Sequence, residues 1–302
     1  MVLIHMRKIL KNIPLIKASR TAGPNRHRGV GICFLLLSLL GLCWFVLFPF
    51  ADVVRRSFLS ATGNHLTGLE NYKVVVSNEA FRLAAGNTAR FFLVCVPLLL
   101  VLSLGLAAML HHIPRHTGVF KTLFLIPMAV PVASIVLLWR TLFNDQGLIN
   151  GWIVGLGGSG ISFMGSSTAF WVLVGSYIWK NLGYDVILWL AGLVGIPESQ
   201  YDAAKVDGAG AVRIFWHITL PNLFPSLYTI LVLSLINAFK VFREAYLVAG
   251  NYPHESIYLL QHLFNNWFRE LSMDKLYAAA VIVSLAILVL ILTLRGIFDN
   301  ER

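Results

Sequence analysis

The sequence predicts an all-α, polytopic membrane protein with six transmembrane helices. Hydrophobic residues make up 57% of its 302 residues and charged residues only 13%, whereas soluble domains carry about 25% charged residues. Several apolar runs approach the ~20 residues that an α-helix needs to cross the hydrocarbon core of a bilayer. In addition, the Lys and Arg residues gather on one side of the pattern that these runs create.

The predicted spans follow one another from near the N-terminus to near the C-terminus. Pro97 in the second span and Pro127 and Pro131 in the third predict kinks, because proline removes a backbone hydrogen bond inside a helix. The fourth and fifth spans contain charged residues. The six spans are Gly31–Phe50, Phe91–Leu110, Leu123–Phe143, Phe170–Val194, Leu223–Ala249 and Tyr277–Leu294.

The formal charge of +10 is divided unevenly between the two sides of the membrane that six spans create. The side of the N-terminus receives thirteen Lys and Arg residues, seven of them within residues 1–29, and the opposite side receives six. Lys and Arg concentrate on the cytoplasmic side of membrane proteins. We therefore interpret the charge as an orientation signal and not as a nucleic-acid-binding surface. Both termini are expected to be cytoplasmic.

This pattern divides the chain into three parts. Residues 1–29 are a basic cytoplasmic segment, residues 30–295 are the six-span domain, and residues 296–302 are a cytoplasmic tail. The six-span domain includes a long cytoplasmic loop, residues 195–222. The first span is expected to be a retained helix, because a secretory signal has a shorter basic lead and a shorter apolar core.

The cytoplasmic loop is polar in composition and carries its own helix signals. Pro197 suits a first helical turn, where its missing N–H costs nothing, and Glu198 favours the positive end of a helix. Residues 201–206 continue that helix. Gly208 can adopt a positive φ and therefore predicts its end.

A second short helix is expected from about Ala209 until Pro221 interrupts it. The product is a compact helix–turn–helix projection with small side chains at Ala203 and Ala204. Such a surface suits docking by a partner protein.

This loop resembles the Glu-Ala-Ala loop of ABC importer permeases, which docks into the ATPase subunit. The family pattern is Glu-Ala-Ala, then Gly, then Ile-x-Leu-Pro; here it is matched by Asp202-Ala203-Ala204, Gly208 and Ile218-Thr219-Leu220-Pro221. Asp202 departs from the pattern, since its side chain is one methylene shorter than Glu. The residues that the resemblance assigns to ATPase coupling are Tyr201, Asp202, Ala203, Ala204, Asp207, Gly208, Ile218, Leu220 and Pro221.

Further landmarks extend the resemblance over about residues 32 to 295 and point to the sugar-type permeases, in particular the larger, maltose-transporter-like subunit. Their order and separations carry the resemblance, which implies the type I ABC importer permease fold. The landmarks are Ser57-Phe58, residues 67–72, Asn87-Thr88, residues 139–150, residues 179–183 and Ala191-Gly192-Leu193.

The resemblance implies a permease subunit of a bacterial inner membrane that moves a carbohydrate, an oligosaccharide or related polyol, into the cytoplasm by ATP-driven alternating access. It implies as partners a second homologous permease subunit, a dimer of ATP-binding cassette ATPases and an extracytoplasmic solute-binding protein, but no nucleic acid. No cofactor is expected. The sequence contains no Gly-x-x-x-x-Gly-Lys-Ser/Thr phosphate loop, so this chain is not expected to be an enzyme.

Charged and amide residues in the fourth and fifth spans mark a candidate substrate path. Lys180 lies ~16 Å of helix rise into its span, where a charge costs roughly 2.5–3.5 kcal/mol unless it faces protein or water. Asp185 does not share its helical face. The candidate path residues are Lys180, Asn181, Tyr184, Asn237, Lys240 and Glu244.

Two interpretations of these charges remain open. Asn237, Lys240 and Glu244 fall on one helical stripe, at steps of three and four residues, which suits a polar path. Alternatively, Lys180 forms a buried pair that orients helices, and Lys240 pairs with Glu244 against the second permease subunit.

Three residues in the spans or directly before them have expected local roles. Asn87 and Thr88 are expected to cap the second transmembrane helix, because N–H groups entering lipid need partners. Gly183 is expected to allow a break in the fourth helix where that helix lines a cavity.

Other functions are less well supported. An ion-coupled secondary transporter stays possible, since Lys180, Lys240, Arg243 and Glu244 could form an intramembrane relay. An intramembrane enzyme lacks a visible catalytic constellation; the Gly-rich loop 155–160 has no nucleophile elbow.

Metal and disulfide chemistry are not expected. The three histidines in the loop after the second span lack a nearby Cys or carboxylate ligand, and the three cysteines lie in apolar spans as small hydrophobic residues. These residues are His111, His112, His116, Cys33, Cys43 and Cys95.

Overall fold

A computed structural model of the chain describes residues 35–36, 38–111 and 117–299. The predicted basic segment 1–29, Cys33, His112, His116 and the last three residues of the tail lie outside these ranges. The chain divides into two compact units, Met1–Arg55 and Arg56–Arg302, which are described separately.

The described part of the first unit is helical. A π-helical turn, η1 (Cys43–Leu47), leads into α3 (Phe48–Ser57), whose last two residues belong to the second unit. Ser38–Ser57 is long and apolar enough to cross a membrane. The first predicted span therefore has the right place, although its helix continues beyond Phe50 to Ser57.

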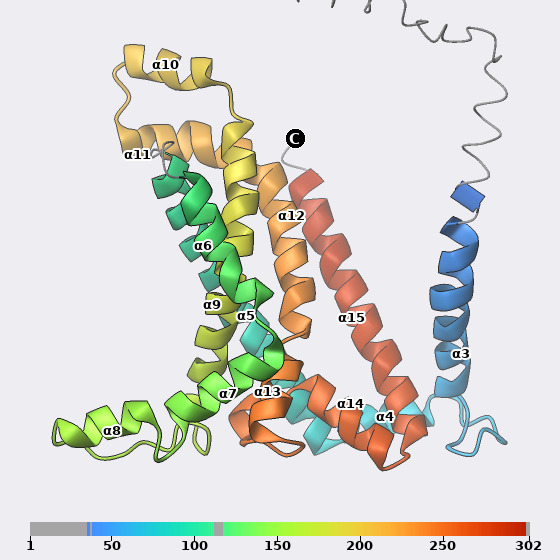
Figure 1. Cartoon of the computed structure of the whole chain (residues 1–302). Helices are drawn as coiled ribbons and strands as arrows, with labels where there is room; N and C mark the ends of the chain where they lie inside the picture. The colour runs from blue at the N-terminus through green and yellow to red at the C-terminus, as the bar shows by residue number, and fades with distance from the viewer. Residues whose placement is uncertain (1–34, 37, 112–116, 300–302) are drawn as a thin grey trace, which may run out of the picture. The chain divides into compact units, whose positions relative to one another are not determined.

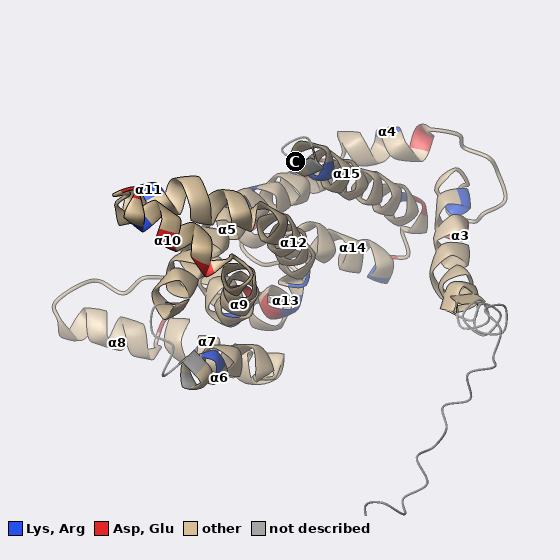
Figure 2. Cartoon of the chain, turned by 90° about the horizontal axis from the view of Figure 1, so that it is seen from above, with Lys and Arg blue, Asp and Glu red and all other residues tan. Residues whose placement is uncertain are grey.

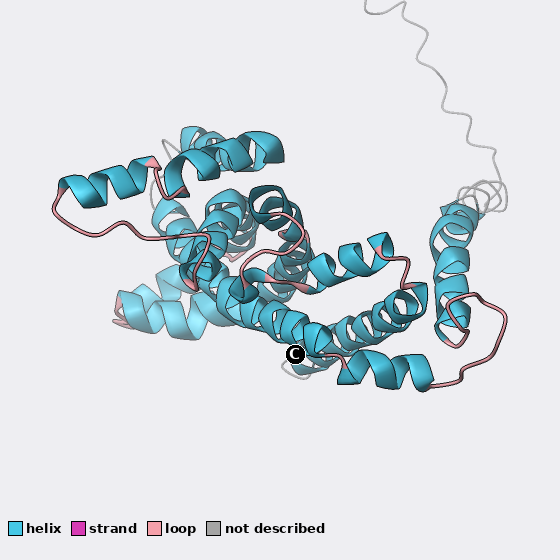
Figure 3. Ribbon diagram, turned by 90° about the horizontal axis from the view of Figure 1, so that it is seen from below, coloured by secondary structure: helices cyan, strands magenta, loops and turns pink. Residues whose placement is uncertain are grey.

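Long helices form the second unit (Figure 1): α5 (Glu79–His111), α9 (Thr168–Val194), α12 (Leu220–Phe239) and α15 (Met273–Asp299). The described residues contain helices and loops but no strand (Figure 3), which confirms the all-α prediction. Phe91 and Leu99 of α5 and Trp189 of α9 are buried in the core, and Trp189 Nε1 donates to Ser103 Oγ at 3.0 Å. This bond gives the indole N–H an acceptor, which the hydrocarbon core of a bilayer could not provide.

Within the described residues, four helices pass a span test of length and composition: Ser38–Ser57, Glu79–His111, Ala211–Ala249 and Met273–Phe298. Two bent pairs pass it together, namely Phe120–Ala129 with Val132–Gly155 and Thr168–Val194 with Glu198–Val206. The total reaches six if each bent pair makes one span, in the same order as the six predicted segments. Figure 2 shows that charged residues are sparse along the long helices and gather at α10 (Glu198–Val206) and α11 (Ala211–Ile214).

The third predicted span is not one continuous helix. It consists of α6 (Thr117–Ala129) and α7 (Val132–Phe143), and the pair that includes them bends by 89°. Pro131 stands at the break with φ −58° and ψ 140°, and a proline also disfavours a helical conformation in the residue before it. The predicted bend is therefore confirmed there, whereas Pro127 lies within α6 and Pro97 within α5.

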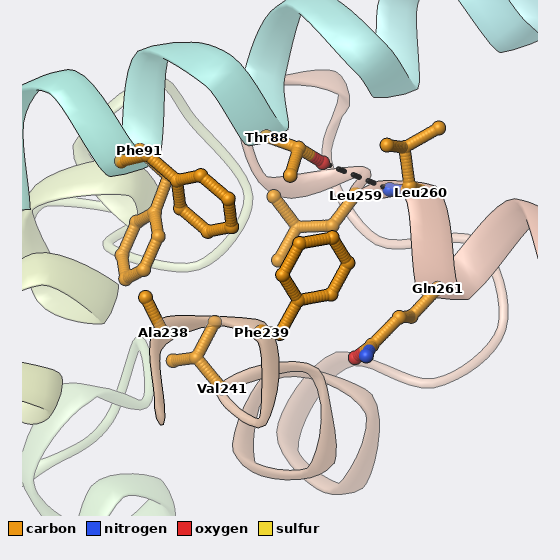
Figure 4. A pocket seen from close by; sticks show the side chains of 9 residues that line it. Thr88, Phe91, Ala238, Phe239, Val241, Leu259, Leu260 and Gln261 are labelled. Atoms are coloured by element: carbon orange, nitrogen blue, oxygen red, sulfur yellow. Dashed lines mark hydrogen bonds between the residues drawn. The ribbon is translucent and has the colours of Figure 1, made fainter. Parts of the chain in front are cut away.

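Asn87 and Thr88 do not cap their own helix, contrary to prediction, because α5 begins at Glu79. They instead hold the chain before α14 (Leu260–Arg269). Asn87 Nδ2 donates to the carbonyl oxygens of Glu255 and Tyr258 at 2.5 and 3.0 Å, and Thr88 Oγ1 accepts from the Leu260 N–H at 3.0 Å (Figure 4). Thr88 thus satisfies a free N–H at the start of α14, so the capping chemistry is correct but the helix is a different one.

Gly183 does not break the fourth transmembrane helix either, since α9 runs without interruption from Thr168 to Val194. A Cβ added at Gly183 would lie 1.9 Å from the carbonyl oxygen of Phe124 and 2.4 Å from its carbonyl carbon. The glycine therefore permits the close approach of α6 to α9.

Candidate functional site

A polar cavity of about 220 Å³ lies among α9, the end of α12 and α13 (Phe242–Ala249). Five of the six residues predicted for the substrate path contribute to its wall, and Tyr184 does not. The lining consists of Met128, Ser176, Tyr177, Lys180, Asn181, Asn237, Lys240, Val241 and Glu244.

The fifth predicted span turns at this cavity. Helix α12 ends at Phe239, and the amide N–H groups of Lys240 and Val241 bond to carbonyls three residues back, at 2.9 and 3.3 Å. Helix α13 then begins at Phe242. The predicted continuous stripe is therefore wrong in detail. Nevertheless, Asn237, Lys240 and Glu244 all reach the same cavity.

An ion pair crosses the cavity wall between α9 and α13. Lys180 Nζ donates to Glu244 Oε1, and the two side chains are only 19% and 9% exposed. The alternative pairing of Lys240 with Glu244 is thus not observed. Asp185 accepts instead from Ser234 Oγ at 2.8 Å and is 1% exposed. The ammonium of Lys180, which would be energetically costly in lipid, therefore has the carboxylate of Glu244 beside it.

The other polar side chains that line the cavity are held in place by hydrogen bonds. Tyr177 donates through its hydroxyl to the Ser234 carbonyl at 2.9 Å, and Asn181 Nδ2 donates to the Tyr177 carbonyl at 2.9 Å. Lys240 Nζ donates to Asn237 Oδ1 at 3.1 Å. These bonds hold phenol, amide and ammonium groups at the surface of one small cavity, which suits a ligand rich in hydroxyl groups.

Sequence reasoning missed four lining residues. Ser176 and Tyr177 stand four and three residues before Lys180 in α9, so the helical repeat places them on the same face and could have identified them. Met128 lies in α6 and Val241 in the turn after α12, so the helical repeat around Lys180 could not identify them.

The loop of residues 195–222 contains the expected first helix and the expected turn. Helix α10 is followed by Gly208 at φ +76°, where the Gly208 and Ala209 amides bond to the carbonyls of Lys205 and Ala204 at 3.0 and 2.9 Å. Only glycine adopts this conformation without strain. The two short helices lie side by side at one end of the long helices (Figure 1).

Pro221 does not interrupt the second helix of the loop, contrary to prediction. Helix α11 continues through a π-helical turn, η3 (Phe215–Thr219), into α12. Pro221 stands in the first turn of α12, where a proline is tolerated. The projection formed by α10 and α11 is therefore joined to α12 without a break in helical structure after Ala211.

The predicted coupling residues divide into an outer and an inner group. Asp202 forms an exposed pair with Lys205, at 3.1 Å, while Tyr201 bonds through its hydroxyl to Thr219 Oγ1 at 3.2 Å and so braces α10 against η3. Exposed are Asp202, Ala203, Asp207, Gly208 and Pro221; half-buried are Tyr201, Ala204, Ile218 and Leu220.

The projection also presents apolar side chains to solvent. Val206 is 88% exposed, Val212 73% and Trp216 59%. Isolated exposed apolar residues are common, but three on a short polar projection suit a contact surface. An adjacent groove of about 600 Å³ lies among α10, α11, η3 and the end of α5.

No group of three His, Cys, Asp or Glu side chains that could hold a metal ion occurs within the part of the chain that the structure describes. The predicted solvated histidine loop falls partly outside that part.

Comparisons with known proteins identify the family. The family model for "Binding-protein-dependent transport system inner membrane component" matches residues 99–301. The probable ABC transporter permease protein YesP of Bacillus subtilis is 30% identical over 278 residues, which cover 87% of this chain and 89% of that protein. The trehalose/maltose transport system permease protein MalF of Thermococcus litoralis is 34% identical over 227 residues, or 74% of each protein.

A solved structure agrees on the fold. A chain of a bacterial ABC transporter involved in the import of the acidic polysaccharide alginate superposes with a TM-score of 0.79 at 20% identity, over 91% of this chain and 96% of that one. The matched family model and these relatives lead to one conclusion: this chain belongs to the family of binding-protein-dependent transport system inner membrane components, the permease subunits of ABC importers.

Proposed function

We propose that this chain conducts a carbohydrate through the inner membrane and pairs with a second homologous permease subunit. In this proposal an ATPase dimer binds the coupling loop, residues 195–222, and an extracytoplasmic solute-binding protein delivers the substrate. The trehalose/maltose name of one relative and the alginate transporter of similar fold support a carbohydrate. The family description itself supports the binding-protein partner.

One observation carries the proposal: the coupling loop joins the two helices that bear the polar cavity. Helix α9 carries Lys180 and ends at Val194, directly before α10, and helix α12 leaves η3 and ends at the cavity. The cavity at Lys180 is ~21 Å of helix rise from the end of α9. A displacement of the loop can therefore move both cavity walls.

Alternating access follows from this connection. Closure of the ATPases on ATP displaces the projection formed by α10 and α11, and α9 and α12 shift with it. Because packed helices favour discrete arrangements over continuous deformation, the cavity would open to one side of the membrane at a time. The ion pair between Lys180 and Glu244 lies between α9 and α13, so such a shift bears directly on it.

The turn at Gly208 gives the test of coupling. Valine at Gly208 should be strained at φ +76°, misplace α10 relative to α11 and abolish transport, while the protein still enters the membrane. Gly210 supplies the matched control, because its φ is −73° and an added Cβ there meets open space. ATPase co-purification and transport should be lost in G208V and kept in G210V. Full transport by an assembled G208V complex would rule out the coupling role.

The proposed orientation places the coupling loop and both termini in the cytoplasm. In a variant without the native cysteines, Lys205→Cys should react with a membrane-impermeant thiol reagent only after the cells are opened. Lys73→Cys, at an exposed position of the short helix α4 (Glu70–Ser77) on the other side, should react in intact cells. Labelling of position 205 in intact cells would mean that the topology is the opposite of the one proposed.

A further inference from the structure

The charges of the polar cavity do not balance. Its wall carries two ammonium groups, Lys180 and Lys240, and one carboxylate, Glu244. Glu244 is paired with Lys180, and Lys240 has no ion-pair partner among the residues that the structure describes. Asp185, the other nearby carboxylate, is buried against Ser234 outside the lining. The described cavity therefore has one uncompensated positive charge.

Hydrogen-bond donors are in excess at the same place. Lys240 gives one of its three N–H donors to Asn237 Oδ1. An ammonium can only donate, so the Asn237 oxygen must face it and the amide NH₂ group points elsewhere. That NH₂ group has no acceptor among the described residues. The two neighbouring side chains thus present spare donors, which is the arrangement that binds an oxyanion.

Neutral sugars do not need such a site. Their hydroxyl groups both donate and accept, so they are served by a mixture of donors and acceptors. Lys240 adds a charged group that can only donate, and it is exposed, so its spare N–H groups can reach a ligand. An anionic group on the ligand would accept charge-assisted hydrogen bonds from Lys240, which are stronger than those that a neutral hydroxyl group accepts. The cavity, at about 220 Å³, is below the roughly 300–1,000 Å³ of pockets for drug-sized ligands, which suits one sugar residue at a time.

We propose that Lys240, with Asn237, selects a carbohydrate that carries an oxyanion: a carboxylate, phosphate or sulfonate on the sugar. This inference rests on the proposed function, because it assumes that the cavity lies on the carbohydrate path. Lys180 has a different role in it, since its charge is already matched by Glu244. The specificity then resides in one side chain of the α12–α13 turn.

The test is binding to the purified permease–ATPase complex, followed by tryptophan fluorescence, since Trp179 directly precedes Lys180. The probes are trimers of glucuronate, galacturonate and mannuronate, their methyl esters, which keep the skeleton and remove the charge, and glucose 6-phosphate. At least one acidic trimer should bind about tenfold or more tightly than its ester. The preference should weaken with salt.

Variants assign that preference to one residue. Lys240→Met should bring the acid-to-ester affinity ratio close to one, and Lys240→Arg should largely keep it. Arg243→Met is the matched control: it removes a neighbouring exposed cation that does not line the cavity, and should leave the ratio unchanged. Glucose 6-phosphate shows whether phosphate replaces carboxylate.

Three outcomes would overturn the inference. In the first, the esters bind as tightly as the acids. In the second, Lys240→Met keeps the acid-to-ester affinity ratio. In the third, Lys240→Met separates the two permease subunits without changing that ratio, which would make Lys240 a subunit contact. If no saccharide of either kind binds, the cavity is not on a carbohydrate path and the proposed function itself fails.

Discussion

Replacing Gly183 by alanine should destabilise the permease although the change adds a single methyl group. The new Cβ would meet the carbonyl oxygen of Phe124 at 1.9 Å and its carbonyl carbon at 2.4 Å, and these backbone atoms cannot rotate away as a side chain can. Helix α6 would have to retreat from α9 and take Met128, a wall of the cavity, with it. Overpacking of this kind costs typically ~1–3 kcal/mol and occasionally more. Thermal unfolding in detergent should show a lower midpoint.

Gly175 supplies the control on the same helix. It is exposed, and an added Cβ there meets nothing within 4 Å. Gly175→Ala should therefore be neutral or slightly stabilising, because alanine is about 1 kcal/mol better than glycine inside a helix. Equal midpoints for the two variants would mean that α6 does not approach α9 through Gly183.

Breaking the Lys180–Glu244 pair from either side should be strongly destabilising. Lys180→Met and Glu244→Gln each leave one mostly buried charge without its partner, which costs ~3–5 kcal/mol in buried pairs. The double variant Lys180→Met with Glu244→Gln removes both charges and should recover most of that loss. The measurement is a double-mutant cycle of thermal stability in the assembled complex.

The exposed pair Lys205–Asp202 is the comparison. Its side chains are 66% and 69% exposed, so Lys205→Ala should have no measurable effect on stability. Additive losses at Lys180 and Glu244 would contradict the pairing across α9 and α13.

The sequence predicted features whose cause is local. Apolar runs of span length located the transmembrane segments, Gly208 marked the turn after α10 through its need for a positive φ, and Pro131 marked the bend between α6 and α7. Each of these follows from the residue itself and its immediate neighbours.

Features that depend on distant partners could not be predicted. Thr88 has capping chemistry, but its N–H partner at Leu260 is 172 residues away. Gly183 shows a need for small size, but not that the carbonyl of Phe124 is the reason. Lys180 required an opposite charge, and the one that it finds, Glu244, lies on α13. The sequence could show that such partners were needed without identifying them.

The most direct test of an ATP-driven permease is uptake into proteoliposomes that contain this chain with its permease, ATPase and solute-binding partners. The substrate is the saccharide that binds most tightly in the fluorescence titration. Uptake should require ATP on the side of the coupling loop and should not change when ionophores collapse proton and sodium gradients. Uptake that continues without ATP but stops with the ionophores would contradict ATP coupling. The Lys180–Glu244 pair would then belong to the relay of an ion-coupled transporter.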